Sequence, residues 1–131
     1  MNIYTERLVK EWRTHGKIVL SVDFDSTIYL YPTIDNQKDI DRTIRLVQLA
    51  HAIGAYIVIF TASEKERFKF IQDYCDSIKI PISSINENPI DLPYGKSGKI
   101  FYNLNICDRS GIFESLNILE EAINEMQKYK N

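Results

Sequence analysis

Residues 17–27 read KIVLSVDFDST, and this stretch decides the fold that we expect for the chain. Within it, Ile18, Val19, Leu20 and Val22 form a short apolar run that is rich in β-branched side chains. Such a run is typical of a strand buried on both faces, as in a parallel sheet. The sequence therefore predicts a parallel sheet that contains this run as a buried strand.

Two carboxylates, Asp23 and Asp25, follow the run with one residue between them. Ionised carboxylates are costly to bury in a core, so we expect both to lie just beyond the carboxyl end of the strand. In open α/β sheets that edge is where ligands bind. A purely structural alternative stays open at this point, because residues 25–27 also have the composition of a turn or a helix cap.

Length and composition predict one globular domain, residues 1–131, with 44% hydrophobic and 26% charged residues. The net charge of −2 argues against a broad basic surface for nucleic acid, although it leaves room for a local patch. Cys75 and Cys107 lack metal-ligand spacing and indicate a reducing compartment. No apolar run reaches the roughly 20 residues that cross a bilayer, and the first residues lack the apolar core of a signal peptide. We therefore expect a cytoplasmic protein with no membrane partner.

Two kinds of apolar pattern alternate along the chain. Helical spacing occurs in residues 3–14, 37–53, 63–78 and 112–126, and strand-like runs occur in 55–61, 80–85 and 101–107. Gly16 is placed to end the first helix, and Ser63 with Glu66 makes a capping-box pattern at the start of the third. Pro81 places its strand at a sheet edge or at a strand start. The alternation predicts a three-layer, Rossmann-like α/β domain with a mostly parallel sheet of about four or five strands.

Polar side chains follow three of the predicted strands: Asp23 and Asp25, then Thr61, then Asp108. Because parallel strands present their carboxyl ends along one edge, these residues are expected to meet there. Lys96 and Lys99 lie on a glycine-containing loop that approaches the same edge. Carboxylates bind a hard cation such as Mg²⁺, while hydroxyl and ammonium groups stabilise phosphoryl oxygens. The set is therefore a candidate site for a magnesium ion and a phosphate.

These motifs resemble those of the haloacid dehalogenase superfamily, which is dominated by phosphatases. The apolar strand followed by DFDST at 23–27 is similar to its first motif, and IVIFT at 57–61 is similar to its second. Lys99 resembles the lysine of the third motif, with Lys96 as the alternative, and Asp108 lies where the fourth motif's acid is expected. The resemblance spans residues 17–111 and implies a small member without a cap domain, because the intervals that often hold a cap are short here.

The resemblance also implies a magnesium-dependent phosphatase that hydrolyses a phosphate monoester through an aspartyl-phosphate. Asp23 would be the nucleophile, and Asp25 would be the general acid and then the general base. The Asp23 carboxylate, the Asp25 backbone carbonyl and Asp108 would hold Mg²⁺. Thr61 and Lys99 would hold the phosphoryl group and offset its charge.

The fourth motif departs from the family pattern, because Cys107 stands where members commonly carry the first of two adjacent acids. We expect Cys107 to be a small buried residue at a strand end rather than a reactive thiol. The missing acid favours an alternative function, a catalytically weakened protein of this type that binds a phosphorylated ligand or a protein partner. A phosphoacceptor signalling domain fits less well, because such domains place the phosphoacceptor on a later strand than the acidic pair.

Without a cap, the site would be covered only by a flap at Tyr29 and Tyr31, whose rings would either stack on a base or pack the flap. Such an open site suits a phosphorylated small molecule or a nucleotide. It also leaves room for the phosphate of a nucleic acid or a protein.

Overall fold

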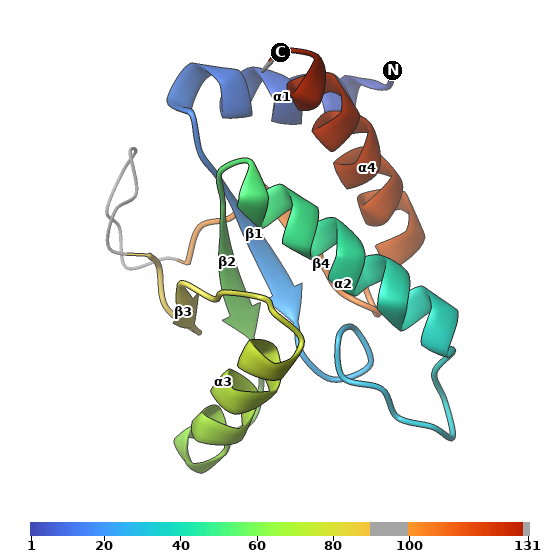
Figure 1. The fold of residues 1–131 in the computed structure, drawn as a ribbon, viewed down its shortest axis with the longest axis vertical. Helices are drawn as coiled ribbons and strands as arrows, with labels where there is room; N and C mark the ends of the chain where they lie inside the picture. The colour runs from blue at the N-terminus through green and yellow to red at the C-terminus, as the bar shows by residue number, and fades with distance from the viewer. Residues whose placement is uncertain (90–99, 130–131) are drawn as a thin grey trace.

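Helices and strands alternate along the chain in the computed structural model, which describes residues 1–89 and 100–129 (Figure 1). In chain order the elements are α1 (Ile3–His15), β1 (Ile18–Asp23), α2 (Gln37–Ala52), β2 (Ala55–Phe60), the 3₁₀ helix η1 (Lys65–Arg67), α3 (Phe68–Ser77), β3 (Ser84–Ile85), β4 (Leu104–Ile106) and α4 (Ile112–Lys128). Every strand pair is parallel, and four α-helices flank the four-stranded sheet. This arrangement confirms the predicted Rossmann-like, three-layer α/β class.

The strand order, β3-β2-β1-β4, determines where a ligand would bind. From β1 the chain moves outward through β2 to β3, and it then returns to the other side of β1 to form β4. The order therefore reverses between β1 and β4, and open α/β sheets bind ligands beside the carboxyl ends of strands at such a reversal. The arrows of β1 and β2 point to the same end of the molecule (Figure 1).

The two faces of the sheet carry unequal amounts of apolar side chain. On one face, Ile18, Leu20 and Val22 belong to a large buried cluster to which all four α-helices contribute. On the other face, Val19 and Val58 form a smaller cluster. Since full burial of a large aliphatic side chain stabilises the fold by about 1.5–3 kcal/mol, the larger cluster provides most of the hydrophobic stabilisation.

Two glycines allow the chain segments before β1 and β2 to approach each other. Gly16 ends α1 in the left-handed conformation, with φ 74°, and its N–H donates to the Trp12 carbonyl, as the sequence predicts. Gly54 has φ 113°, and a Cβ there would lie 2.8 Å from the Gly16 carbonyl oxygen. Trp12 is fully buried beside this contact.

The third helix begins later than the capping-box pattern predicts. The α-helix starts at Phe68, after η1, and neither of these elements has a side-chain cap at its start. The Ser63 hydroxyl instead accepts a hydrogen bond of 2.8 Å from the Arg67 guanidinium. The predicted strands 80–85 and 101–107 are also shorter than expected, and both lie at the edges of the sheet.

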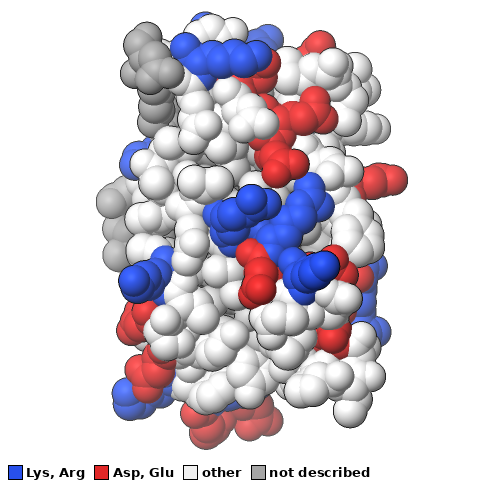
Figure 2. Space-filling view, turned by 45° about the vertical axis from the view of Figure 1, so that its right-hand side comes forward, with Lys and Arg blue, Asp and Glu red and all other residues white. Residues whose placement is uncertain are grey.

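The face that bears α2 and α4 carries basic and acidic side chains side by side (Figure 2). Arg42 and Arg45 of α2 lie 3.4 and 3.9 Å from the Glu120 carboxylate of α4. This face therefore agrees with the small net charge and offers no broad basic surface. Among the described residues, no helix combines the length and the apolar character that crossing a membrane requires.

Candidate active site

The carboxyl ends of β1 and β4 lie next to each other at the reversal of the strand order. The register pairs Val22 with Ile106, so the following residues, Asp23 and Cys107, are neighbours across the two strands. The Cys107 Sγ lies 3.9 Å from Asp23 Oδ2 and 4.0 Å from Asp108 Oδ1. One ligand-type atom from each of the three residues lies within 4.8 Å of the other two. The structure thus brings Asp23 and Asp108 together, and it adds a thiol beside both.

Two asparagines attach the short strand β4 to β1. The Asn103 Oδ1 accepts a hydrogen bond of 2.6 Å from the Val19 N–H, and the Asn103 N–H donates to the Val19 carbonyl at 2.8 Å. The Asn105 Oδ1 accepts a hydrogen bond of 2.8 Å from the buried Ser21 hydroxyl. These bonds hold the two strand ends, and the acidic groups on them, at a fixed separation.

Thr27 orients Asp108. Its hydroxyl donates to Asp108 Oδ1 at 3.4 Å and accepts from the Asp108 N–H at 3.3 Å, and the side chain is fully buried. These two contacts restrict the orientation of the Asp108 carboxylate. Sequence reasoning assigned Thr27 no role, although the residue closes the DFDST motif.

Asp23 lies where a negative charge is poorly tolerated. Burial, and then the hydrogen bond and charge of Asp108, together raise the pKa of Asp23 from 3.8 to about 6. Within residues 1–89 and 100–129, neither Asp23 nor Asp108 forms an ion pair with a lysine or an arginine. In the described part of the chain, no lysine or arginine therefore lies within ion-pair distance of these two carboxylates.

Asp25 lies in the opposite electrostatic surroundings. Both of its oxygens accept hydrogen bonds of 2.9 Å from the Arg67 guanidinium, and the Tyr31 hydroxyl donates to Oδ1 at 3.1 Å. These bonds, Arg67 first, lower the pKa of Asp25. The guanidinium also lies 5.3 Å from the centroid of the Phe24 ring. Sequence reasoning missed Arg67, and only its position about one helical turn after Ser63, in the segment that follows β2, could have drawn attention to it.

The predicted flap contains one packing tyrosine and one polar tyrosine. The Tyr29 ring stacks on Phe24 at 5.3 Å and meets the edge of Tyr74 at 5.0 Å. For Tyr29 this favours packing over stacking on a base. Tyr31 is 37% exposed, and its hydroxyl reaches Asp25.

Thr61 is held in place by Asn86, another residue that sequence reasoning missed. The Thr61 N–H donates to Asn86 Oδ1 at 2.9 Å, and Asn86 Nδ2 donates to the Thr61 carbonyl at 2.8 Å. Asn86 has φ 56°, in the left-handed region that asparagine adopts more readily than most residues. An asparagine directly after a short predicted strand was therefore the only sequence signal for this residue. The Thr61 hydroxyl accepts from the Ser63 N–H at 3.0 Å, which leaves its proton to donate elsewhere.

One cavity is lined by both Asp23 and Asp25, although their surroundings differ. Its volume is about 710 Å³, and its walls include Asp23, Asp25, Thr61 and Asp108. This size is within the range of roughly 300–1,000 Å³ that is common for small-molecule sites. Lys96 and Lys99 lie outside the described residues, so the phosphate-binding lysine stays a prediction.

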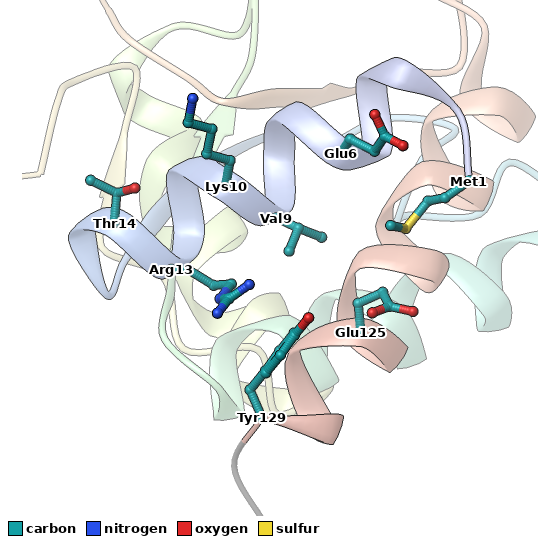
Figure 3. A pocket seen from close by; sticks show the side chains of 8 residues that line it. All are labelled: Met1, Glu6, Val9, Lys10, Arg13, Thr14, Glu125 and Tyr129. Atoms are coloured by element: carbon teal, nitrogen blue, oxygen red, sulfur yellow. The ribbon is translucent and has the colours of Figure 1, made fainter.

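A second hollow lies between α1 and α4, away from the carboxyl ends of the strands (Figures 1 and 3). Its volume is about 470 Å³, and Arg13 and Tyr129 point toward each other across it, with the guanidinium 3.9 Å from the ring centroid. Glu125, on its wall, pairs with Lys128 at 2.9 Å. None of the predicted site residues lines this hollow, so we place the candidate site at the end of β1.

The ligand atoms at Asp23, Cys107 and Asp108 fit a divalent cation, but they only partly fit Mg²⁺. Carboxylate oxygens suit this hard cation, whereas a thiol does not. Cys107 is also only partly buried and lines the cavity, which corrects the expectation that it is a small buried residue. The Asp25 carboxylate points to Arg67 and is not part of this group, and its backbone carbonyl as a metal ligand stays a prediction.

Comparisons with known proteins show the fold. No protein-family model and no curated protein matches the sequence. The solved structure of a conserved protein from Bacteroides thetaiotaomicron is similar to this chain, with a TM-score of 0.61 and 23% sequence identity. The match covers 83% of this chain and 91% of the other. At this level of identity the likeness supports the α/β architecture and carries no statement about activity.

Proposed function

We propose that this protein hydrolyses phosphate monoesters in the manner of the haloacid dehalogenase superfamily. The observation that carries the proposal is the meeting of Asp23 with Asp108 at the reversal of the strand order. Asp25 and Thr61 line the same cavity. A nucleophile, a second carboxylate for proton transfer and a hydroxyl donor for phosphoryl oxygens are therefore available within one site.

In the first step, an Asp23 oxygen would attack phosphorus, and the bond between phosphorus and the ester oxygen would break. The leaving oxygen would take a proton from Asp25, and Asp23 would carry the phosphoryl group as an acyl phosphate. The Thr61 hydroxyl would donate to a phosphoryl oxygen. The nucleophile must be ionised, and in the cation-free protein burial and Asp108 oppose this state by raising the pKa of Asp23 to about 6.

In the second step, water would attack phosphorus, and Asp25 would accept its proton. The bond between phosphorus and Asp23 would break, which releases inorganic phosphate and restores the carboxylate. The structure holds Asp25 against Arg67 with a lowered pKa, which favours this base role. The acid role in the first step requires Asp25 to carry a proton, and the contact with Arg67 opposes this.

A divalent cation, which the family resemblance implies to be Mg²⁺, would be held by Asp23 and Asp108 and would offset negative charge on the phosphoryl group. The cavity size favours a phosphorylated small molecule or a nucleotide as substrate. Phosphate carried by a nucleic acid or a protein is a further substrate class for an open site.

The test is hydrolysis of p-nitrophenyl phosphate by the purified protein, with and without divalent cations. We expect cation-dependent turnover, and we expect Asp23→Asn to lower it on the order of 10³-fold or more, because the nucleophile is lost. Asp25→Asn should lower turnover on the order of 10²-fold, because only proton transfer is impaired. Asp73→Asn, an exposed change on α3, is the matched control and should leave turnover intact.

Two results would contradict the proposal. The first is the absence of turnover across a panel of phosphate esters with Mg²⁺, Mn²⁺ or Zn²⁺. The second is turnover that survives in Asp23→Asn, which would mean that another group, or a contaminating enzyme, carries out the reaction.

A second candidate function is binding of a phosphorylated ligand without turnover. The observation that favours it is the ion pair of Asp25 with Arg67. This ion pair keeps the proposed general acid ionised, so that it has no proton to donate. Calorimetric binding of inorganic phosphate by a protein that hydrolyses no ester would select this function over the first.

A further inference from the structure

We propose that Cys107 is a ligand of the cation site and that it makes the site select Zn²⁺ or Co²⁺ over Mg²⁺. This inference rests on the proposed cation site at Asp23 and Asp108. It concerns the ion that the site takes, not the reaction that follows.

The distances around the Cys107 sulfur suit a tetrahedral ion. With a metal–sulfur bond of about 2.3 Å and a metal–oxygen bond of about 2.0 Å, a tetrahedral site separates sulfur from oxygen by roughly 3.5 Å. The observed separations are 3.9 Å to Asp23 and 4.0 Å to Asp108. A side-chain adjustment of about half an ångström would bring the two sulfur–oxygen separations to this value. The two carboxylate oxygens of the group lie within 4.8 Å of each other.

The backbone places the thiol beside the acids without help from a flexible segment. Cys107 follows directly after β4, and the register with β1 sets it opposite Asp23. Thr27 fixes the Asp108 carboxylate on the third side. Three protein ligands at the ends of two paired strands, with a cavity on the open side, match the pattern of catalytic zinc sites, in which water or substrate takes the fourth position.

The chemistry of the ligands then decides which ion is preferred. Thiolate sulfur binds the softer first-row ions strongly, whereas Mg²⁺ requires oxygen ligands in a near-octahedral arrangement. Cysteine binds as the thiolate, and its proton passes to solvent. A site with one sulfur and two carboxylates therefore favours Zn²⁺ and Co²⁺. Its affinity for Mg²⁺ is lower, because sulfur stands where Mg²⁺ would need an oxygen ligand.

Cys75 provides a matched control. It is fully buried in α3, and burial raises its pKa to about 12, so it is not available to a cation. The Cys75→Ala variant leaves Cys107 as the single thiol of the chain.

The experiment is a Co²⁺ titration of the reduced full-length protein, followed by its absorbance. We expect the near-ultraviolet charge-transfer band of a thiolate–Co²⁺ bond in the wild type and in Cys75→Ala. Stoichiometric Zn²⁺ should abolish the band, and an excess of Mg²⁺ should not. Cys107→Ser should lack the band and bind Zn²⁺ on the order of 10- to 100-fold more weakly. Cys107→Asp should also lack the band, and it should bind Mg²⁺ more tightly than the wild type does.

The proposal is overturned if the wild type shows no charge-transfer band, or if Cys107→Ser keeps the band and the wild-type Zn²⁺ affinity. The band is independent of catalysis, so the two proposals can fail separately. A band without ester hydrolysis would overturn the reaction and support the ligand assignment. Hydrolysis that depends on Mg²⁺ and on Asp23, without the band, would overturn the ligand assignment alone.

Discussion

Asp23 and Asp25 are separated by one residue, yet they belong to two regions with opposite electrostatics. We call these regions the acidic side (Asp23, Cys107 and Asp108) and the arginine side (Asp25, Arg67 and Tyr31). On the acidic side, burial and a neighbouring carboxylate disfavour the ionised form of Asp23. On the arginine side, a bidentate ion pair and a tyrosine hydroxyl favour the ionised form of Asp25.

A tight turn creates this difference. In a continued strand, residues 23 and 25 would face the same side of the sheet. The strand ends at Asp23, however, and the Phe24 carbonyl accepts hydrogen bonds from the N–H groups of Thr27, Ile28 and Tyr29 at 3.4, 3.1 and 3.1 Å. The turn directs Asp25 toward Arg67, away from the acidic side. Two identical side chains thus acquire different chemistry from the backbone that carries them.

Among substitutions at these two aspartates, the largest effect on stability is expected for Asp23→Asn, which should stabilise the folded protein. The pKa of Asp23 is raised in the folded state, so the folded protein loses stability as the pH rises from about 4 to about 6. The amide is never charged, and it should therefore raise the free energy of unfolding at pH 7 by about 1–2 kcal/mol, after allowance for solvent screening.

This gain is checked by denaturant unfolding of both proteins from pH 4 to pH 8 in the presence of a chelator. The difference should be small near pH 4 and complete above pH 6, where Asp23 is ionised. Asp73→Asn removes one exposed carboxylate and should show no comparable gain. A loss of stability in Asp23→Asn at pH 7 would show that the acidic side does not disfavour the charge.

The second-largest effect on stability is expected for Asp25→Asn, and it has the opposite sign. This substitution should destabilise the protein by about 1 kcal/mol at pH 7, because a bidentate, partly exposed ion pair with Arg67 is lost. The pKa of Asp25 is lowered, so the stabilising contribution is present above the ordinary aspartate range and is lost as the pH falls below it. A double-mutant cycle with Arg67→Met should return a favourable coupling energy. Additive single effects would mean that the ion pair contributes nothing.

The smallest effect is expected for Tyr31→Phe, which removes one donor at 3.1 Å from Asp25. Stability should change by only a few tenths of a kcal/mol, because the hydroxyl is exposed to solvent. The pKa of Asp25 should rise, since a hydrogen bond to its charged form is lost. Carbon-detected NMR titration of the Asp25 carboxyl group measures this pKa. An unchanged or lower pKa would show that the Tyr31 hydroxyl does not stabilise the ionised form of Asp25.

The fold could be predicted because its two central strands and its helices have strong apolar periodicity. β1 and β2 are six residues each and almost continuously buried, which the sequence shows directly. The edge strands were harder to delimit. β3 and β4 have two and three residues, and their neighbouring backbone is held partly by side chains such as Asn86 and Asn103, which periodicity does not reveal.

The site could be predicted only where strand ends decide it. Asp23, Thr61 and Asp108 meet because parallel strands end along one edge, and this required no side-chain information. The position of Cys107 depends on the register between β1 and β4, which the sequence of either strand leaves open. Arg67 depends on the late start of α3 and on a long side chain that reaches across to Asp25.

The short strand β4 has a consequence for dynamics. Local opening of a structure costs least free energy where few backbone hydrogen bonds and few buried apolar contacts are lost. Because β4 pairs with β1 at three residue positions, we expect opening at this edge of the sheet. Opening at this edge would carry Cys107 and Asp108 away from Asp23, and it would expose Ile106, the fully buried residue that β4 contributes to the larger core cluster. A ligand that bridges the two strand ends binds only the closed form, so it protects the edge of the sheet against opening. Occupancy of the site and order in the last strand are therefore thermodynamically coupled.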